Sequence, residues 1–465
     1  MLCGSYRVDM THTVAQETVD RPARALRWGG LLALAAILVI GGGVALDRWR
    51  ASTNSGLDSA SLQPWFGPAT FADALIATDQ TIAGRRETLA LAPAEWTSGE
   101  SLALALIARW RLTGDYADLA EAQRLLDAGV AKTSGPSGPL IAAAALGVLV
   151  HRLDQADAAL ARFAGAVAPE TREAAEAAAL AGDVALQRGQ LDAARVKYAL
   201  AVQISPPPGG DLRLAFLPAM RGDPDRAAAE LEPLLAVPRQ QPAALATLLL
   251  RRAQLDLWRG DWAGAGRWVG AAQRAFPGWW IADAHAAQQF ALAGRTDDAI
   301  RAYTIVAKRS GRPEVMDALA HLLRLQGQGA ASRAWAARAA AGWEARAALF
   351  PEAVIQHRAE HELAVGSAAK ALTLAETDVA ARPGPQGIAL LARALILSGR
   401  PGEALRWLDR SRDAGFVTAG ALMLRAEAEA ALGDGAASEA AREQALAINP
   451  RAADPASRMI WFGHD

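Results

Sequence analysis

A glycine recurs about every 34 residues between positions 189 and 433, and this period restricts the fold more than any other feature of the chain. Neighbouring glycines of the period are 33 to 39 residues apart. A repeat of this length is one supersecondary unit that cannot bury its apolar face alone, so successive units must stack into a continuous array. The glycines are Gly189, Gly222, Gly260, Gly294, Gly327, Gly366, Gly399 and Gly433.

Two columns of small residues keep register with these glycines. The residue seven positions before each glycine is Gly or Ala, from Gly182 to Ala426, and the residue five positions after it is Ala or Ser, from Ala194 to Ser438. Small side chains at fixed places allow two helix axes to approach closely, and a left-handed glycine ends a helix. About a quarter of the chain is Ala, the strongest helix former. The pattern predicts one antiparallel helix pair per period. It excludes an all-β fold, and the single cysteine excludes a disulfide scaffold.

A proline seventeen positions after several of the glycines predicts where each second helix ends. It stands at Pro206, Pro277, Pro383 and Pro450. The segments GQLDAARVKYALAVQISP (189–206) and GDGAASEAAREQALAINP (433–450) closely resemble the tetratricopeptide repeat (TPR) family. The resemblance implies an all-α fold, a TPR-type right-handed α-solenoid of about ten helix pairs. A HEAT or armadillo-like solenoid, with repeats of about 40 to 47 residues, fits the observed spacings poorly.

The repeat signal weakens toward the N-terminus. Gly114 begins a plausible pair, while the helical stretch from Gly138 to Pro169 fills another pair without a turn glycine. The expected organisation is an N-terminal cytoplasmic tail (1–27), a transmembrane helix (28–46), a flexible linker (47–69), a TPR solenoid (70–450) and a C-terminal tail (451–465), with the solenoid divided into a capping helix (70–99), degenerate repeats (100–170) and clear repeats (171–450).

Residues 28–46 form a stretch of 19 positions without a charge. At about 1.5 Å per helical residue the stretch reaches nearly 30 Å, the thickness of a bilayer's hydrocarbon core. We interpret it as one uncleaved transmembrane helix. The alternatives are a buried core helix and a cleaved secretory signal, whose apolar region of about 7–15 residues ends at a small-x-small site. The segment from Val44 to Asp47 offers no such site.

The charges that flank this stretch bear on its orientation. Arg21, Arg24 and Arg27 precede it, and Arg48 and Arg50 follow it. The slight excess on the first side favours a cytoplasmic N-terminus. We expect a single-pass protein of a bacterial inner (cytoplasmic) membrane with a periplasmic solenoid, and a solenoid that faces the cytoplasm is the alternative. Translation could also start at Met10, which would remove the only cysteine, Cys3.

The sequence contains one motif that suggests catalysis. His357-Arg358-Ala359-Glu360-His361 reads H-x-x-E-H and resembles the inverzincin zinc-peptidase motif, with two histidines on one helix face. A zinc-dependent hydrolase that uses His357 and His361 is therefore an alternative function. The motif falls in the first helix of the Gly366 repeat, and no separate catalytic fold is left over. With no phosphate loop, dinucleotide motif or nucleophile elbow, we expect no cofactor and no enzymatic activity.

The overall charge excludes one class of partner. Lys and Arg number 48 against 49 acidic residues, so the net charge of -1 provides no field that would attract nucleic acid. We also expect no small-molecule substrate. The TPR resemblance implies that the first helices of successive pairs line a concave groove that binds peptides or partner helices. The residues expected to face it are Arg251, Gln254, Trp258, His285, Gln288, Asp317, His321, Arg324, His357, Glu360 and Arg393.

These features together predict a non-enzymatic, membrane-anchored scaffold that binds a partner or client polypeptide in the groove, as in envelope complex assembly. The TPR resemblance includes modules of cytochrome c maturation that hold the tail of an apoprotein, and such a chaperone is a narrower alternative. Five tryptophans lie between positions 258 and 280. Because large aromatic rings fill gaps between Ala-rich helices, we expect them to pack in the interior, with an exposed partner-binding patch as the alternative.

Overall fold

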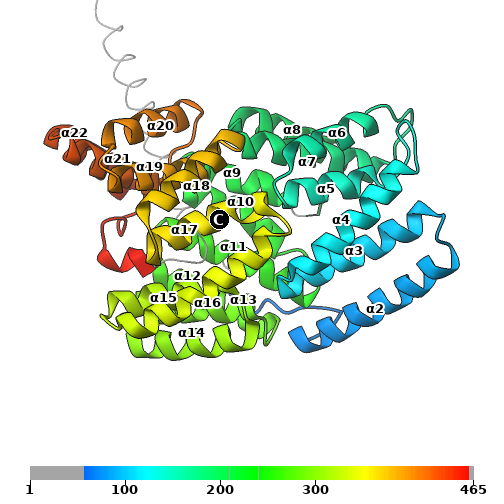
Figure 1. The fold of residues 1–465 in the computed structure, drawn as a ribbon, viewed down its shortest axis with the longest axis horizontal. Helices are drawn as coiled ribbons and strands as arrows, with labels where there is room; N and C mark the ends of the chain where they lie inside the picture. Colours follow the sequence, from blue (N-terminus) through cyan, green and yellow to red (C-terminus); the bar gives the residue numbers. More distant parts are fainter. Residues whose placement is uncertain (1–56, 209, 239, 460–465) are drawn as a thin grey trace, which may run out of the picture. The chain divides into compact units, whose positions relative to one another are not determined.

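The computed structural model describes residues 57–208, 210–238 and 240–459, and this part of the chain is a series of α-helices without a strand (Figure 1). The predicted transmembrane stretch, 28–46, lies outside the described residues. Among the described helices, none combines the length and the apolar character needed to cross a bilayer. The helices are α2 (Phe71–Leu91), α3 (Trp96–Thr113), α4 (Tyr116–Ala131), α5 (Leu140–Leu149), α6 (Leu153–Phe163), α7 (Thr171–Gln187), α8 (Leu191–Ile204), α9 (Leu212–Met220), α10 (Pro224–Leu235), α11 (Pro242–Trp258), α12 (Trp262–Ala275), α13 (Trp280–Leu292), α14 (Thr296–Ser310), α15 (Pro313–Leu325), α16 (Gly329–Ala347), α17 (Pro351–Val365), α18 (Ala368–Ala381), α19 (Pro385–Leu397), α20 (Pro401–Asp413), α21 (Ala419–Ala431), α22 (Gly435–Ile448) and a 3-10 helix, η1 (Pro455–Met459).

The helices from α3 to α22 form ten antiparallel pairs, each an odd-numbered helix followed by an even-numbered one. This confirms, for the described residues, the predicted all-α array of about ten pairs. Contacts between successive pairs join odd-numbered helices directly, as in α5 with α7, α15 with α17, α17 with α19 and α19 with α21. The odd-numbered helices therefore lie next to one another on one side of the array. We call that side the inner face.

The turn inside most pairs has one geometry. In the α7–α8 turn, Gly189 has a φ of +73°, and the next amide, of Gln190, donates to the carbonyl of Ala185 five residues back. This is the Schellman ending of a helix, in which a left-handed residue lets two amides cap the last carbonyls. His151 occupies the same place in the α5–α6 turn, with a φ of +62°. His151 therefore takes the place of the turn glycine in the pair between Gly138 and Pro169, for which the sequence offers no such glycine.

Gly366 is the exception to the turn geometry. Its φ is -113°, so it is not left-handed, although the repeat predicts a turn glycine there. The amide of Ser367 donates instead to the side chain of Glu362, at 2.8 Å. A carboxylate therefore caps the end of α17 in place of the backbone.

The two columns of small residues mark where the helices of a pair cross, which confirms the predicted close approach. The column before the glycines is buried at every position, and a Cβ on Gly182 would collide with the buried ring of Tyr198. Two serines of the other column show the approach directly. Ser332 donates from Oγ to the carbonyl of Ala320 at 2.8 Å, and Ser438 makes the equivalent bond within its own pair. A larger residue at these positions would force the helices apart.

The first half of the array contacts the second half through turns. Trp280 Nε1 donates to the carbonyl of Leu112, at the α3–α4 turn, with a distance of 3.0 Å. At the α5–α6 turn, the guanidinium of Arg152 lies 4.9 Å from the ring centroid of Phe350, in the link between α16 and α17. At the α7–α8 turn, Gly189 lies against the carbonyl of Pro383.

Later turns of the first half contact links of the second half in the same way. The amide of Val417, between α20 and α21, donates to the carbonyl of Met220 at the α9–α10 turn, at 2.8 Å. Asn449, after α22, donates from Nδ2 to the carbonyl of Leu257 at the α11–α12 turn, at 3.4 Å. The turns of the second to fifth pairs thus each meet the link that follows the pair five places later. The first turn follows the same rule through Gly114, whose carbonyl accepts a hydrogen bond from Arg312 in the α14–α15 link. The array closes on itself, so that its two halves pack together within residues 57–459.

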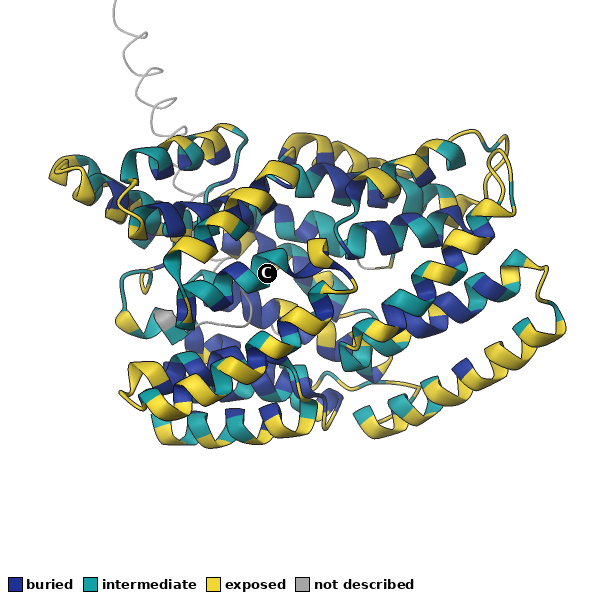
Figure 2. Ribbon diagram, in the orientation of Figure 1, coloured by how far each residue is buried: buried dark blue, intermediate teal, exposed yellow. Residues whose placement is uncertain are grey.

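Buried apolar side chains lie where helices meet within and between pairs (Figure 2). The largest cluster runs through α11–α15 and contains four of the five clustered tryptophans, Trp262, Trp268, Trp279 and Trp280. The fifth, Trp258, packs edge-on against Phe216 and is half-buried. The tryptophans therefore fill the interior, as predicted. A second cluster joins α2–α5 to α16 and α17.

Both ends of the described chain differ from the sequence prediction. The linker 47–69 was expected to be flexible, yet its described part is packed: Leu62 contacts the largest core cluster, and the amide of Trp65 donates to the carbonyl of Gln240 at 2.9 Å. The capping helix expected over 70–99 ends at Leu91, and residues 96–99 belong instead to α3, which pairs with α4. Residues 451–459, expected to be a tail, carry η1, which packs on α13.

Candidate partner-binding site

All eleven residues predicted to face a partner lie on odd-numbered helices. They come from five consecutive first helices, α11, α13, α15, α17 and α19. Their exposure is uneven: Arg251 and Arg324 are exposed, whereas Gln254, His285, Gln288 and Asp317 are buried, and the other five are half-buried. The structure thus places the set on the first helices of five successive pairs, while the direction of these side chains toward a groove and their role in partner binding stay predictions.

The arginines of the set have different surroundings. Arg251 donates to the side-chain oxygen of Gln254 at 2.9 Å, and its guanidinium lies 6.0 Å from the ring centroid of Phe216. Arg393 forms an ion pair with Glu427 on α21. Arg324 is exposed near the end of α15. Exposed arginines held beside polar and aromatic groups are suited to bind carboxylates or carbonyl oxygens of a peptide.

Asp317 has a structural use that the sequence did not indicate. Its Oδ1 lies 2.6 Å from Nδ1 of His361, and its Oδ2 accepts a hydrogen bond of 2.7 Å from Nε1 of Trp343. The ring of His357 stacks on Trp343, with centroids 5.2 Å apart and planes 13° apart. This buried cluster joins α15, α16 and α17. Trp343 and Asp317 lie 14 or more residues from the histidines, so no local motif connects them.

Charges in the same region perturb the titration of His361 and of a neighbouring carboxyl. Burial lowers the pKa of His361, but the hydrogen bond and charge of Asp317 outweigh it, and the pKa is raised. Burial raises the pKa of Glu314, yet Arg346, 2.6 Å away, outweighs this and leaves the pKa lowered. Both groups are therefore held charged by a partner, as in structural ion pairs.

Removing the Asp317 charge should change how stability depends on pH. Because the pKa of folded His361 is above the unfolded value of about 6.5, its pairing stabilises the fold fully below pH 6.5 and is lost as pH rises through the folded pKa. We expect Asp317→Asn to lower the free energy of unfolding by about 1.5–3 kcal/mol at low pH, and by less at high pH. Urea unfolding of both proteins at pH 5.5, 7 and 8.5 measures this difference. A difference independent of pH would contradict the assigned pair. Asp298→Asn, on a half-buried carboxylate that pairs with arginines and not with a histidine, is the control.

The H-x-x-E-H motif is used in side-chain packing. Nδ1 of His357 lies 3.1 Å from the carboxylate of Glu360, whereas Nδ1 of His361 faces Asp317 on another helix. Within the described residues, no group of three or more His, Cys, Asp and Glu side chains is arranged to hold a metal ion. No observation thus favours the zinc hydrolase alternative.

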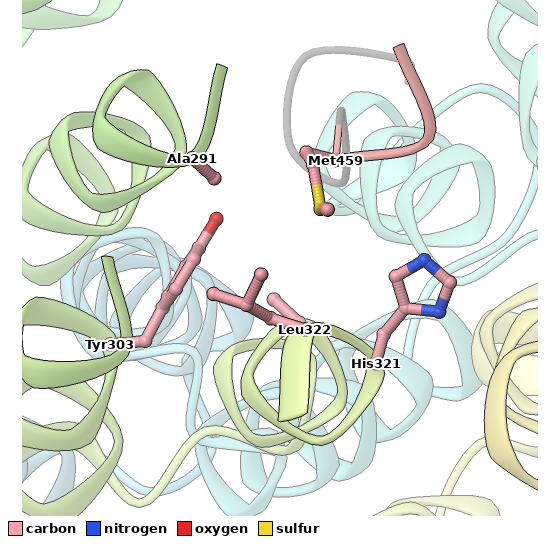
Figure 3. Close-up of a pocket in the computed structure, with 6 residues that line it drawn as sticks. Ala291, Tyr303, His321, Leu322 and Met459 are labelled. Atoms are coloured by element: carbon pink, nitrogen blue, oxygen red, sulfur yellow. The ribbon is translucent and has the colours of Figure 1, made fainter. Parts of the chain in front are cut away.

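A small cavity lies beside the inner face of α13 and α15 (Figure 3). Tyr303 directs its hydroxyl toward this space, while the side chains of His321 and Met459 approach it from other sides. Complete burial raises the pKa of Tyr303, which therefore stays protonated. The sequence did not predict that Met459, which belongs to η1, would reach this face.

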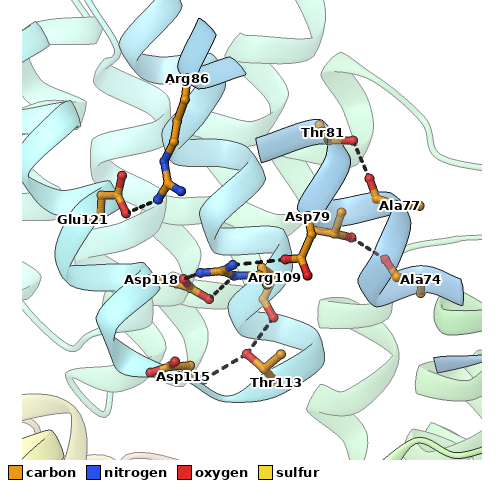
Figure 4. A network of polar contacts seen from close by, with 11 residues as sticks. Ala74, Ala77, Asp79, Thr81, Arg86, Arg109, Thr113, Asp115, Asp118 and Glu121 are labelled. Atoms are coloured by element: carbon orange, nitrogen blue, oxygen red, sulfur yellow. Dashed lines mark hydrogen bonds and ion pairs between the residues drawn. The ribbon is translucent and has the colours of Figure 1, made fainter. Parts of the chain in front are cut away.

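A dense polar network also joins α2, α3 and α4 (Figure 4). Arg109 on α3 donates from Nε to Asp118 at 2.9 Å and from Nη1 to Asp79 at 3.1 Å, and Arg86 pairs with Glu121 at 2.8 Å. These pairs attach the otherwise exposed α2 to the first helix pair. Their groups are mutually satisfied, so we assign the network a structural role.

Comparisons with known proteins gave similarities of structure only. No protein-family profile and no curated protein matches the chain. Solved structures similar to it include the TPR domain of P58(IPK), with 16% identity, coverage of 84% of this chain and 93% of that chain, and a TM-score of 0.26. Yeast Tom70 is 14% identical, with 78% and 87% covered and a TM-score of 0.37. The Cut9–Hcn1 hetero-tetramer of APC/C is 14% identical, with 85% and 95% covered and a TM-score of 0.31.

Proposed function

We propose that this chain is a non-enzymatic TPR scaffold that binds a segment of another protein on its inner face. The observation that carries the proposal is the placement of the eleven predicted residues on five successive first helices, with Arg251 and Arg324 exposed among them. Repeat arrays present such continuous surfaces because each pair adds one helix to the same side. Exposed arginines such as Arg251 and Arg324 favour an extended or helical polypeptide with acidic or carbonyl acceptors.

The proposal includes a location. Residues 28–46 would anchor the chain in a bacterial inner membrane, with the helix pairs in the periplasm and a role in assembling an envelope complex. The support for this part is the uncharged stretch and the arginines that flank it. A chaperone that holds the tail of an apoprotein during cytochrome c maturation is a narrower form of the same proposal.

Charge reversal of the inner-face arginines tests the proposal. We expect Arg251→Glu, Arg324→Glu and Arg393→Glu together to weaken partner binding by about tenfold or more, because reversed charges repel the acceptors they would attract. The fold should be kept, since these side chains are exposed or half-buried. The matched control reverses three exposed arginines of even-numbered helices, Arg301, Arg338 and Arg442.

The partner is first trapped in intact cells with a photoreactive residue at Arg324, purified, and titrated against the two triple variants. Equal affinity for both variants would contradict binding on the inner face. The identity of the trapped protein also tests the location. A cytoplasmic protein would contradict a periplasmic solenoid, whereas a periplasmic or membrane protein would support it.

A further inference from the structure

The turns inside the helix pairs differ between the first half of the array (α3–α12) and the second half (α13–α22). In the first half, a Cβ on any turn glycine would meet residues of the second half, as Gly222 would meet the side chains of Ile448 and Val417. In the second half, four of the five turn glycines would carry a Cβ with no other described residue within 4 Å. They are Gly294, Gly327, Gly399 and Gly433. The first-half turns are therefore covered, whereas most second-half turns are open.

The apolar residues just before the turn glycines show the same difference. Met220, in the first half, is half-buried and packs against a cluster that contains Phe416 of the α20–α21 link. In three second-half turns the corresponding leucine is uncovered. Leu325, Leu397 and Leu432 are 39%, 53% and 54% exposed. Each of these turns presents an apolar side chain in the position that a link covers elsewhere in the same chain.

The links that follow the helix pairs show the opposite difference. In the second half, Phe350 in the α16–α17 link and Phe416 in the α20–α21 link are buried. The α6–α7 link of the first half, residues 164–170, contains no buried residue, and its Val167 is fully exposed. The chain thus has open turns in its second half and an open link in its first half, which are the two kinds of surface that bind each other within the chain.

The spacing of the internal contacts indicates which open surfaces match. A turn meets the link that follows the pair five places later, so the turn of the seventh pair, α15–α16, would need a twelfth pair, and the described chain has ten. If the count continues into a second copy, the twelfth pair is α5–α6 of that copy, and Leu325 meets Val167 in the α6–α7 link. By the same count, the ninth turn, next to Leu397, meets the α10–α11 link, beside which Phe66 is 51% exposed.

We propose that the open turns of one copy bind the open links of a second copy, with the α15–α16 turn against the α6–α7 link. The contact buries apolar side chains on both surfaces. The last carbonyls of a helix have no partner within it, so the turns also offer acceptors, as the carbonyl of Met220 does for the amide of Val417. Because the two surfaces are different, the contact is heterologous, and copies add head to tail into rings or open chains.

The mass of the particle tests this association. The full chain is kept in dodecyl maltoside throughout, and its protein mass is measured by light scattering at increasing concentration. We expect the mass to rise from one copy to two or more. A turn variant, Leu325→Glu with Leu397→Glu, and a link variant, Val167→Glu with Phe66→Glu, should each associate at least tenfold more weakly. The control replaces Val196 and Ile305 by Glu, which are 57% and 63% exposed on α8 and α14, and should associate like the unchanged chain. A chain that remains a single copy at every concentration would overturn the proposal.

Mixing the two variants tests the head-to-tail arrangement. The turn variant keeps its links and the link variant keeps its turns, so one intact contact can form between them. We expect the mixture to give particles of two copies, although neither variant associates alone. A mixture that stays at one copy would contradict a contact between turns and links.

Cross-linking between copies locates the contact in a chain without these charge changes. Leu325 is replaced by p-benzoylphenylalanine in chains labelled with nitrogen-15, which are mixed with unlabelled chains, irradiated and digested. We expect cross-links to unlabelled peptides that contain residues 164–170. Cross-links only to other regions, or only within labelled chains, would overturn the proposal. The association uses no inner-face partner, so its failure would leave the proposed function standing.

Discussion

Replacing Asp256 with alanine should lower the free energy of unfolding by about 3–5 kcal/mol. Asp256 and Arg252 form an ion pair within α11, with side chains only 1% and 3% exposed, and Arg259 donates to the same carboxylate at 2.8 Å. The guanidinium of Arg252 also lies 5.3 Å from the ring centroid of Trp268. Without the carboxylate, a charged guanidinium stays buried beside Trp268 and loses the group that neutralises it. The desolvation penalty of an unpaired buried ion gives the expected size of the effect.

Two further variants distinguish the effect of leaving a buried charge unpaired from the effect of removing a carboxylate side chain. Asp298→Ala removes a half-buried carboxylate that pairs with the exposed arginines Arg295 and Arg301 in the first turn of α14. Such pairs contribute little, so we expect a loss of about 1 kcal/mol or less. Replacing both members of the buried pair, Arg252→Met with Asp256→Leu, should recover most of the lost stability, since apolar residues of similar volume can substitute for a buried ion pair. Chemical unfolding of the four proteins provides the comparison. A double variant as unstable as Asp256→Ala would show that the unpaired charge is not the cause.

Gly189→Ala should destabilise the fold considerably more than Gly399→Ala. Both glycines are left-handed turn residues with a φ of +73°, so each alanine costs about 1 kcal/mol for the backbone conformation alone. A Cβ at Gly189 would also collide with the carbonyl oxygen of Pro383, whereas a Cβ at Gly399 would have nothing within 4 Å. Overpacking adds about 1–3 kcal/mol. We therefore expect a loss of about 2–4 kcal/mol at Gly189 and about 1 kcal/mol at Gly399.

The comparison tests whether the two halves of the array pack together in solution. Thermal or urea unfolding of the two single variants measures the difference in stability. Hydrogen exchange should locate the effect of Gly189→Ala at both the α7–α8 turn and the α18–α19 link, which are far apart in sequence. Equal losses in the two variants would mean that Gly189 has no neighbour from the second half.

The sequence predicted the helix pairs correctly because the signals for them are local. A left-handed glycine, a small residue seven positions before it and another five positions after it are all contained in one pair. Ser332 shows how direct the relation is, because its hydroxyl bonds to the carbonyl of the small residue that it faces. The same register placed all eleven candidate residues on odd-numbered helices. It could not predict which of them are buried.

The contacts that decide the candidate site are not local. Asp317 and His361 are 44 residues apart and share a hydrogen bond, while Met459 reaches a cavity lined by Tyr303 and His321. His357 and His361 resembled a zinc motif only because sequence shows helix spacing and not the neighbours of each imidazole. In the structure each ring has its own carboxylate partner.

Gly189 and Gly399 show most clearly what the sequence determines and what only the tertiary structure decides. In the sequence they are equivalent: each ends the first helix of a pair, and each has small residues at the same distances. That equivalence determines the turn, the pairing and the stacking of pairs. Only the tertiary structure decides that Gly189 is packed against Pro383 while Gly399 faces open space. The reason is that each pair is rotated slightly relative to the one before it, and these small rotations add up over many pairs. Whether one half of an array meets the other depends on that sum, which no single repeat contains.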